Sequence, residues 1–200
     1  MLVIGLTGPT GAGKGMVSDI FASYGLPILD ADAIYRELLI PPSECLDALA
    51  DHFGTQILTA DRTLDRRVLA SIVFSSESEL AELNRIAHFY VMKEIRKRIA
   101  RLQKENTKAV VMDAPQLFEA HAERDCNIIV SVIADRDVRA ERIMRRDGID
   151  ASAAQARMQS QHGDGFFRAH SDYVIENNQS PELLRPAVHQ ILCEMGVIQT

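Results

Sequence analysis

Short, mostly apolar runs recur along the chain, and each ends near a glycine, an aspartate or an asparagine. The runs occupy residues 2–6, 27–29, 109–112, 127–134 and 173–175. Segments of this length that are apolar at nearly every position are typical of strands buried on both faces of a parallel sheet. The pattern therefore predicts five such strands.

Between these runs, apolar residues recur three or four positions apart, which predicts amphipathic helices. Met16, Val17, Ile20 and Phe21 show this spacing soon after the first strand. The predicted helical ranges are 14–24, 135–146, 151–161, 181–195 and much of 33–107. Strands that alternate with helices imply crossover connections, so we expect a three-layer α/β domain around a parallel sheet.

The long helical stretch interrupts this alternation of strands and helices. We therefore expect a single domain whose core spans about residues 1–32 and 108–200, with a helical insertion at about 33–107. The chain has 200 residues and is 46% hydrophobic, which is enough apolar material for a sizeable core.

Composition and charge argue against several classes of protein. The net charge of -6 makes a general nucleic-acid binder unexpected, because such proteins need a broad basic surface. The 3 cysteines match neither a disulfide framework nor a zinc site, and we expect reduced structural thiols. No apolar run approaches the length of a membrane span, and the N-terminal residues contain no basic leader. We expect a cytoplasmic protein without a membrane segment and without an obligate protein partner.

A glycine-rich segment with a lysine joins the first predicted strand to the first helix. Its residues are Gly8, Pro9, Thr10, Gly11, Ala12, Gly13, Lys14, Gly15 and Met16. G-x-x-x-x-G-K is the spacing of the P-loop, in which glycines let backbone N–H groups face a phosphate chain. The helix N-terminus adds positive potential, and Lys14 adds a mobile charge near the β- and γ-phosphates of a nucleotide. An ordinary glycine-rich turn is the alternative, but a strand, a helix and a lysine in register favour the P-loop.

Gly15 departs from the motif, because this position normally carries the serine or threonine whose hydroxyl binds Mg²⁺. Neither Gly15 nor Met16 supplies such an oxygen. Water can take that position, since Mg²⁺ in proteins commonly retains several waters. We therefore expect weaker metal or nucleotide affinity, without a necessary loss of activity.

Three aspartates follow predicted strands, at the edge where ligands gather in open α/β sheets. Asp30 and Asp32 follow the second strand, and Asp113 ends the third. Asp32 is the candidate general base, because phosphoryl transfer to an alcohol needs a group that orients the hydroxyl and accepts its proton. The alternative is that either of the first two aspartates caps the next helix. Asp113 is either a carboxylate that acts on Mg²⁺, directly or through water, or a turn residue that ends the strand.

Five arginines crowd one predicted helix, and Arg139, Arg142 and Arg146 share a face of it by their spacing. Planar guanidinium groups suit phosphate and the charge that develops during phosphoryl transfer. Arg142 is the first candidate for phosphate contact, followed by Arg145 or Arg146. We expect most of the other arginines on a solvated face, because acidic residues lie among them. This helix and the next, at about 139–165, are expected to form a lid that excludes water from ATP.

Taken together and in order, these motifs resemble the dephospho-CoA kinase family. The P-loop alone indicates only a nucleotide enzyme, whereas the ordered set, which spans about residues 3–178, is far more specific. The segments that carry the resemblance are 5–8 with the P-loop, 30–32, 64–67, 83–84 with His88, Pro115 with 117–119, Arg142 with 145–148, Arg157 with Gln161, and 172–177.

The resemblance implies a P-loop kinase fold with a five-stranded parallel core, a helical substrate-binding region and a lid. It implies ATP-dependent phosphorylation of the ribose 3′-hydroxyl of dephospho-CoA to give CoA, the last step of coenzyme A biosynthesis, with Mg²⁺. By position, Lys14 and the loop amides would hold the ATP phosphates, Asp32 would act on the 3′-hydroxyl, and Arg142 would contact phosphate from the lid.

The same resemblance implies roles for three further side chains. Arg66 and His88 would lie toward the acceptor dephospho-CoA, and Asn177 would lie toward the adenine of ATP.

Three residues depart from the family pattern, and they leave other functions open. Gly15 replaces the hydroxyl residue, Phe89 stands where proline is usual, and Gln116 stands where leucine is usual. The alternatives are another small-molecule or nucleotide P-loop kinase, for which the acceptor region would be decisive, and a nucleotide- or CoA-binding regulatory protein without turnover, which Gly15 suggests.

Overall fold

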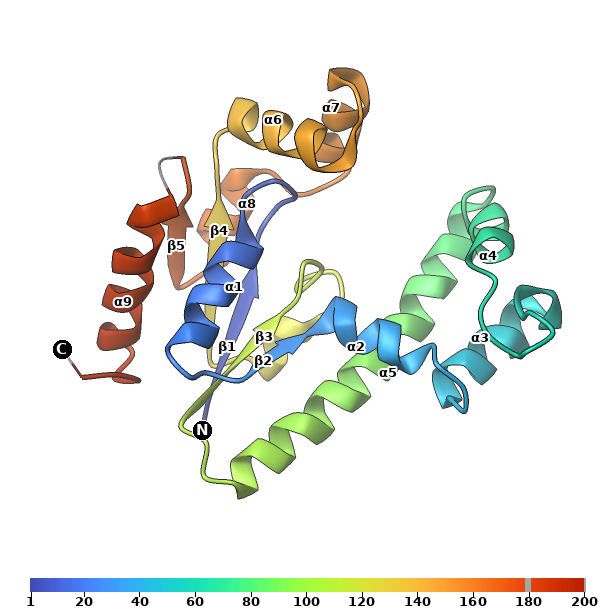
Figure 1. Ribbon diagram of the computed structural model, residues 1–200, viewed down its shortest axis with the longest axis horizontal. Coiled ribbons are helices and arrows are strands. Elements are labelled where there is room, and N and C mark those ends of the chain that lie inside the picture. Colours follow the sequence, from blue (N-terminus) through green and yellow to red (C-terminus); the bar gives the residue numbers. More distant parts are fainter. Residues whose placement is uncertain (179–180, 200) are drawn as a thin grey trace. The chain divides into compact units, whose positions relative to one another are not determined.

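The computed structural model describes residues 1–178 and 181–199 of the chain (Figure 1). The chain divides into two compact units. The first unit contains Met1–Leu29 and Leu102–Thr200, and the second contains Asp30–Arg101. The P-loop and the arginine-rich helix belong to the first unit, whereas Asp32, Arg66 and His88 belong to the second.

A five-stranded sheet forms the centre of the first unit. Its strands are β1 (Leu2–Thr7), β2 (Ile28–Asp30), β3 (Ala109–Asp113), β4 (Ile128–Ile133) and β5 (Tyr173–Glu176). The strand order is β2-β3-β1-β4-β5, and β1 pairs in parallel with β3 and β4, as β4 does with β5. The five-stranded parallel sheet expected from the sequence is therefore confirmed.

The register of the sheet brings the carboxyl ends of its strands to one edge. Leu6 of β1 is paired with Asp113, the last residue of β3. On the other side of β1, Thr7 is paired with Ser131 of β4. The P-loop therefore leaves the sheet beside Asp113, at the edge where ligands bind in open α/β folds.

Helices cover both faces of this sheet. On one face, α1 (Lys14–Ser23) and α9 (Leu184–Glu194) pack side by side, and Phe21 and Leu192 are fully buried in a cluster with apolar side chains of β1, β3, β4 and β5 (Figure 1). On the other face, α8 (Asp164–Ala169) packs against β4 and β5. This double cover explains why the central strands are apolar at nearly every position.

The helices of the first unit follow the predicted ranges, apart from two shifted boundaries and one helix that the apolar pattern does not indicate. The arginine-rich helix is α6 (Arg136–Asp147), and the next is α7 (Ala151–Gln159), which leaves Gln161 outside the helix. The predicted helix at 181–195 begins as a 3₁₀ turn, Pro181–Leu183, before α9. Helix α8 was not predicted; it has only 6 residues and contains Gly165, so its sequence carries little helical periodicity.

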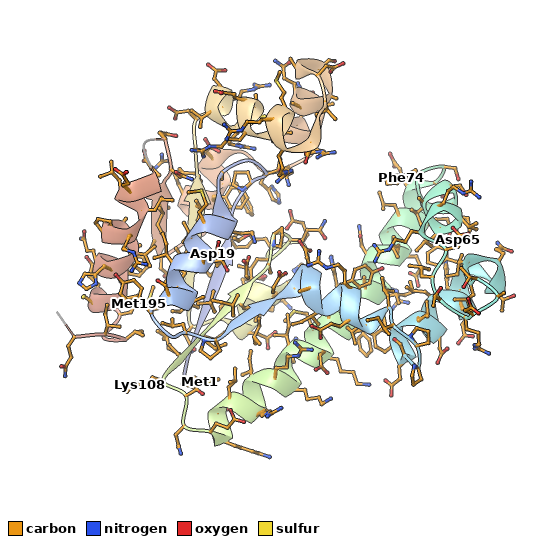
Figure 2. The ribbon with its side chains drawn as sticks, in the orientation of Figure 1. Met1, Asp19, Asp65, Phe74, Lys108 and Met195 are labelled. Atoms are coloured by element: carbon orange, nitrogen blue, oxygen red, sulfur yellow. The ribbon has the colours of Figure 1, made fainter. Side chains whose placement is uncertain are left out.

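The second unit is helical. It contains α2 (Ala31–Leu38), α3 (Glu44–Phe53), a 3₁₀ turn at Thr55–Ile57, α4 (Arg66–Val73) and most of α5 (Glu77–Lys104). Side-chain caps fix the helix starts: Ser43 accepts from the Leu46 amide, and Asp65 accepts from the Arg67 and Val68 amides. Figure 2 shows Asp65 and Phe74 at the two ends of α4. Leu49, Ile57 and Ile86 belong to the apolar cluster that holds these helices together.

The three cysteines form no disulfide. Burial raises the pKa of Cys45 to about 11 and that of Cys126 to about 12, so both thiols stay protonated at neutral pH. Cys126 packs beneath β1, where a β-carbon at Gly5 would lie 2.7 Å from its sulfur. Among the described residues, no helix combines the length and the apolar character that crossing a lipid bilayer requires.

Candidate active site

The P-loop wraps from the end of β1 into the first turn of α1 through glycines that the backbone requires. Gly8 has a φ of 146°, and a β-carbon there would lie 2.1 Å from the carbonyl oxygen of Val132. Gly13 has a φ of 92°, and a β-carbon there would lie 2.1 Å from Nδ2 of Asn177. Any larger residue at either position would push the loop away from the strand ends.

The N-terminus of α1 is the part of this loop that suits an anion. Gly13 is its N-cap residue, and no side chain caps the helix there. The first amides of α1 are thus left without side-chain acceptors, and the helix dipole adds positive potential at the same place. A phosphate group supplies the acceptors that this helix end lacks.

Lys14 lies at the carboxyl edge of the sheet, where its ammonium group forms an ion pair with Oδ1 of Asp113. The side chains of Lys14 and Asp113 are 18% and 8% exposed. The ion pair joins residues that are far apart in sequence, because β3 ends beside the start of the P-loop. The candidate phosphate cation and the candidate metal-binding carboxylate are therefore direct neighbours.

Arg142 and Asn177 meet on the carbonyl side of the P-loop. Nη1 of Arg142 lies 3.5 Å from the carbonyl oxygen of Gly11 and 3.4 Å from that of Ala12. Asn177 is 1% exposed and donates from Nδ2 to the Ala12 carbonyl over 2.8 Å. Nη2 of Arg142 lies 3.5 Å from Oδ1 of Asn177. These two candidates, from α6 and from the end of β5, thus come together at the loop.

Thr10 connects the P-loop to the segment that follows α7 and to α6. Its amide donates to Oε1 of Gln161 over 2.9 Å, and its carbonyl accepts from Nε of Arg139 over 2.9 Å. Nη2 of Arg146 lies 3.5 Å from the Thr10 hydroxyl oxygen. Arg145, by contrast, is exposed on α6.

The expectation of a solvated face is wrong for Arg139, which is 5% exposed. The charge pattern of α6 placed Arg139 on one face with Arg142 and Arg146, but nothing in the sequence indicated that this face packs on the P-loop. Gln161 was part of the resemblance, yet only the fold reveals its bond to the loop.

In the second unit, the structure separates the two aspartates of the 30–32 segment. Asp30 is the N-cap of α2 and accepts from the Ala33 amide over 3.0 Å. Asp32 lies in the first turn of α2 and is exposed. The capping role that the sequence left open for either residue therefore belongs to Asp30.

The other candidates of this unit occupy α4 and α5. Arg66 is the first residue of α4 and is exposed, and His88 lies half-buried on α5. Burial raises the pKa of Tyr35 to about 12, with a smaller raising effect from Cys45 and an opposing effect from Arg66. Tyr35 therefore carries a protonated hydroxyl, and its pKa is affected by the charge of Arg66. Tyr35 lies one turn along α2 from Asp32. No motif in the sequence identified Tyr35 as part of this region.

Gly15 and Met16 lie on the open side of the first turn of α1. Both are exposed, and a β-carbon built at Gly15 meets no atom within 4 Å. No packing constraint therefore requires glycine at this position.

Comparison with known proteins agrees with this geometry. A family model described as dephospho-CoA kinase matches residues 2–182. The chain belongs to the dephospho-CoA kinase family. It is thus an enzyme, a P-loop kinase that transfers a phosphoryl group to a small molecule.

Individual members of the family match over almost their whole length. The dephospho-CoA kinase of Syntrophotalea carbinolica is 37% identical over 195 residues, which cover 98% of this chain and 92% of the relative. The crystal structure of a Thermus thermophilus protein is 31% identical with a TM-score of 0.79 and covers 97% of both chains. The dephospho-CoA kinase from Campylobacter jejuni is 25% identical with a TM-score of 0.73 and covers 98% of both chains. These matches favour a dephospho-CoA kinase over another small-molecule P-loop kinase and over a regulatory protein without turnover.

Proposed function

We propose that this enzyme transfers the γ-phosphoryl group of ATP to the ribose 3′-hydroxyl of dephospho-CoA, giving ADP and CoA. The observation that carries the proposal is the uncapped N-terminus of α1 behind Gly13, with Lys14 at the carboxyl edge of the sheet. In a chain of the dephospho-CoA kinase family, this arrangement supports a triphosphate as the phosphoryl donor.

On the donor side, the ATP phosphates are held by Lys14 and by the backbone amides of the loop from Gly8 to Met16. Lys14 exchanges its contact with Asp113 for a contact with the β- and γ-phosphates, where its charge offsets the charge of the transferring group. Arg142 stabilises the same group from α6, with Arg145 as a second cation of that helix. Asn177 lies toward adenine. Helices α6 and α7 form the lid, within about residues 139–165.

On the acceptor side, Asp32 orients the 3′-hydroxyl and accepts its proton as the oxygen attacks the γ-phosphorus. Its exposure in the first turn of α2 leaves the carboxylate accessible to substrate. Arg66 and His88 contribute to binding of dephospho-CoA, which carries phosphate groups that suit a guanidinium. The helical unit at about residues 33–107 thus serves as the acceptor-binding part of the enzyme.

The residues around Lys14 fit an Mg²⁺ ion that arrives with ATP. Asp113 offers one carboxylate, and among the described residues no group of three or more His, Cys, Asp or Glu side chains could hold a metal by itself. Mg²⁺ commonly binds through one or two carboxylates, substrate phosphates and water, so a single acid suffices. Asp113 would hold the ion directly or through water, and the ion would neutralise charge on the phosphates.

Replacing Gly15 with serine is expected to lower the Mg²⁺ concentration for half-maximal activity by about tenfold, because the hydroxyl adds a metal ligand or an outer-shell partner. The open space around Gly15 accepts the side chain. The measurement is a Mg²⁺ titration of the initial rate at fixed ATP.

Gly15→Ala is the matched control, because it brings the same helical preference as serine or better, without the hydroxyl. Its Mg²⁺ titration should overlay that of the wild type. An unchanged Mg²⁺ requirement in Gly15→Ser would contradict the idea that the missing hydroxyl limits metal binding here.

The proposed reaction is tested by incubating the purified protein with Mg²⁺-ATP and dephospho-CoA and by measuring both ADP and CoA. Equal formation of the two products supports the proposal. Turnover with nucleosides, nucleotides or other alcohols, and none with dephospho-CoA, would show that the acceptor substrate is a different small molecule. Binding of ATP and dephospho-CoA without product would indicate a regulatory protein.

A further inference from the structure

Arg139 is a charged side chain that the fold buries against the P-loop. It is 5% exposed, yet it extends from the second turn of α6, a helix whose other arginines are more exposed. Its Nε donates to the carbonyl oxygen of Thr10 over 2.9 Å, and its Nη1 donates to Oδ1 of Asp164 over 3.1 Å. Asp164 is the first residue of α8, so one guanidinium joins the loop, α6 and α8.

The backbone of the loop also packs tightly on this part of α6. A β-carbon at Gly11 would lie 2.7 Å from the carbonyl oxygen of Arg139 and 3.1 Å from its Cα. Gly11 has a φ of 80°, a conformation that favours glycine. The loop and α6 are therefore fitted to each other at the residue that makes the hydrogen bond to Thr10.

Burying this guanidinium is unfavourable in itself. Burial lowers the pKa of Arg139, and Asp164 opposes that effect. Nη2 has no hydrogen-bond partner among the described residues, which adds a desolvation penalty. An ion pair with a buried guanidinium and a partner carboxylate that is 39% exposed contributes little net stability, because desolvation of the cation offsets the attraction. A role other than stability therefore accounts better for the pair.

The hydrogen bond to Thr10 has a consequence for the next amide of the loop. In a trans peptide, the C=O of one residue and the N–H of the following residue point in opposite directions. With the Thr10 carbonyl held toward α6, the Gly11 N–H is turned away from α6. Asn177 acts on the loop in the same way two residues later, because its bond to the Ala12 carbonyl turns the Gly13 N–H to the opposite side.

We propose that Arg139 is a positioning residue for the phosphoryl donor. Asp164 holds the Arg139 guanidinium in place, and Arg139 fixes the Thr10 carbonyl so that the Gly11 amide faces the phosphates of ATP. The inference rests on the proposed use of ATP by the P-loop. It concerns the donor only, so it leaves the dephospho-CoA site unaffected. Arg139 touches no substrate; it acts through the backbone of Thr10 and Gly11.

The test compares Arg139→Gln, Arg139→Lys and Asp164→Asn with the wild type. ATP affinity is measured by calorimetry with Mg²⁺-ATP, and KM is measured separately for ATP and for dephospho-CoA. Arg139→Gln is expected to weaken ATP binding and raise the KM for ATP by about 10- to 100-fold, as a misplaced binding group does. The KM for dephospho-CoA should stay within about twofold, a split that a general loss of structure would not produce.

The remaining variants separate charge from geometry. Arg139→Lys should recover part of the ATP affinity, because it keeps the charge but cannot bond Thr10 and Asp164 in the same fixed geometry. Asp164→Asn should shift the KM for ATP in the same direction by a smaller factor. The double variant Arg139→Gln/Asp164→Asn should bind ATP no more weakly than Arg139→Gln alone, because Asp164 acts through Arg139. Arg136→Gln, exposed on the same helix, is the matched control and should behave as the wild type.

Three results would overturn the inference: a folded Arg139→Gln with wild-type affinity for ATP, additive losses in the double variant, or equal rises in both KM values. If Arg139→Gln does not fold, Asp164→Asn decides, since its side chain is 39% exposed and the substitution keeps its shape. Unchanged ATP affinity in that variant would then refute the role. Failure of the wild type to bind ATP would instead refute the proposed function, so the two failures are distinguishable.

Discussion

Replacing Asp32 with asparagine is expected to lower kcat with dephospho-CoA by about 10²- to 10⁴-fold and to leave the KM for ATP nearly unchanged. Asparagine keeps the size and polarity of the side chain but cannot accept the proton of the 3′-hydroxyl. The substitution leaves the cap of α2 in place, because Asp30 accepts from the Ala33 amide, while Asp32 lies exposed in the first turn. The measurement is a steady-state analysis of both substrates with product detection.

Asp30→Asn is the matched control for this prediction. Asparagine caps helices about as well as aspartate, so α2 should start at the same residue and the rate should change little. Equal losses of rate and of ATP affinity in Asp32→Asn would argue against its role as the base. A rate loss in Asp30→Asn as large as in Asp32→Asn would move the role to the neighbouring carboxylate.

Replacing Lys14 with methionine is expected to lower kcat/KM for ATP by about 10²- to 10³-fold, because the substitution removes the mobile charge from the β- and γ-phosphates. The same change leaves Asp113 without its ion-pair partner while its side chain is 8% exposed. We therefore also expect the free energy of unfolding to fall by about 1–3 kcal/mol, as for an unsatisfied buried polar group. Steady-state kinetics with ATP report the first effect, calorimetry reports the accompanying loss of ATP affinity, and thermal unfolding reports the change in stability.

The double variant Lys14→Met/Asp113→Asn separates stability from binding. It removes the unpaired charge, so the thermal midpoint should return toward the wild-type value while ATP binding stays weak. Recovery of ATP binding in the double variant would show that Lys14 matters by neutralising Asp113 and not by contacting phosphate. Near-wild-type ATP affinity in Lys14→Met alone would refute the proposed donor site.

The strands and the P-loop were predictable because their signals are local. An uninterrupted apolar run is enough to indicate a strand covered on both faces, as for Ala109–Asp113, which is buried at every position. Gly8 and Gly13 are placed by the motif spacing, and their positive φ values follow from the turn itself. In the second unit, the repeat of apolar positions along α5 gave its helical character without knowledge of its neighbours.

Helix α8 shows where local signals fail. Its 6 residues are too few to form a stable helix in isolation, and its sequence has no clear apolar stripe. Packing decides its structure: the ring of Phe166 lies edge-on to that of Phe118 at 5.0 Å between centroids, and Phe167 is buried. Such contacts come from a segment far away in sequence, which periodicity cannot register.

The sequence by itself determined the five strands, the longer helices between them, the phosphate-binding loop and the identity of its lysine, because each depends on residues within a few positions of one another. Only the tertiary structure decided that Lys14 pairs with Asp113, that Asp30 and not Asp32 caps α2, and that Arg139 is buried on Thr10. The ion pair of Lys14 and the hydrogen bond from Arg139 to the Thr10 carbonyl join residues about a hundred or more positions apart. The choice of cap depends on where the chain leaves β2. Strand register and helix packing set these distances, and no local pattern encodes them.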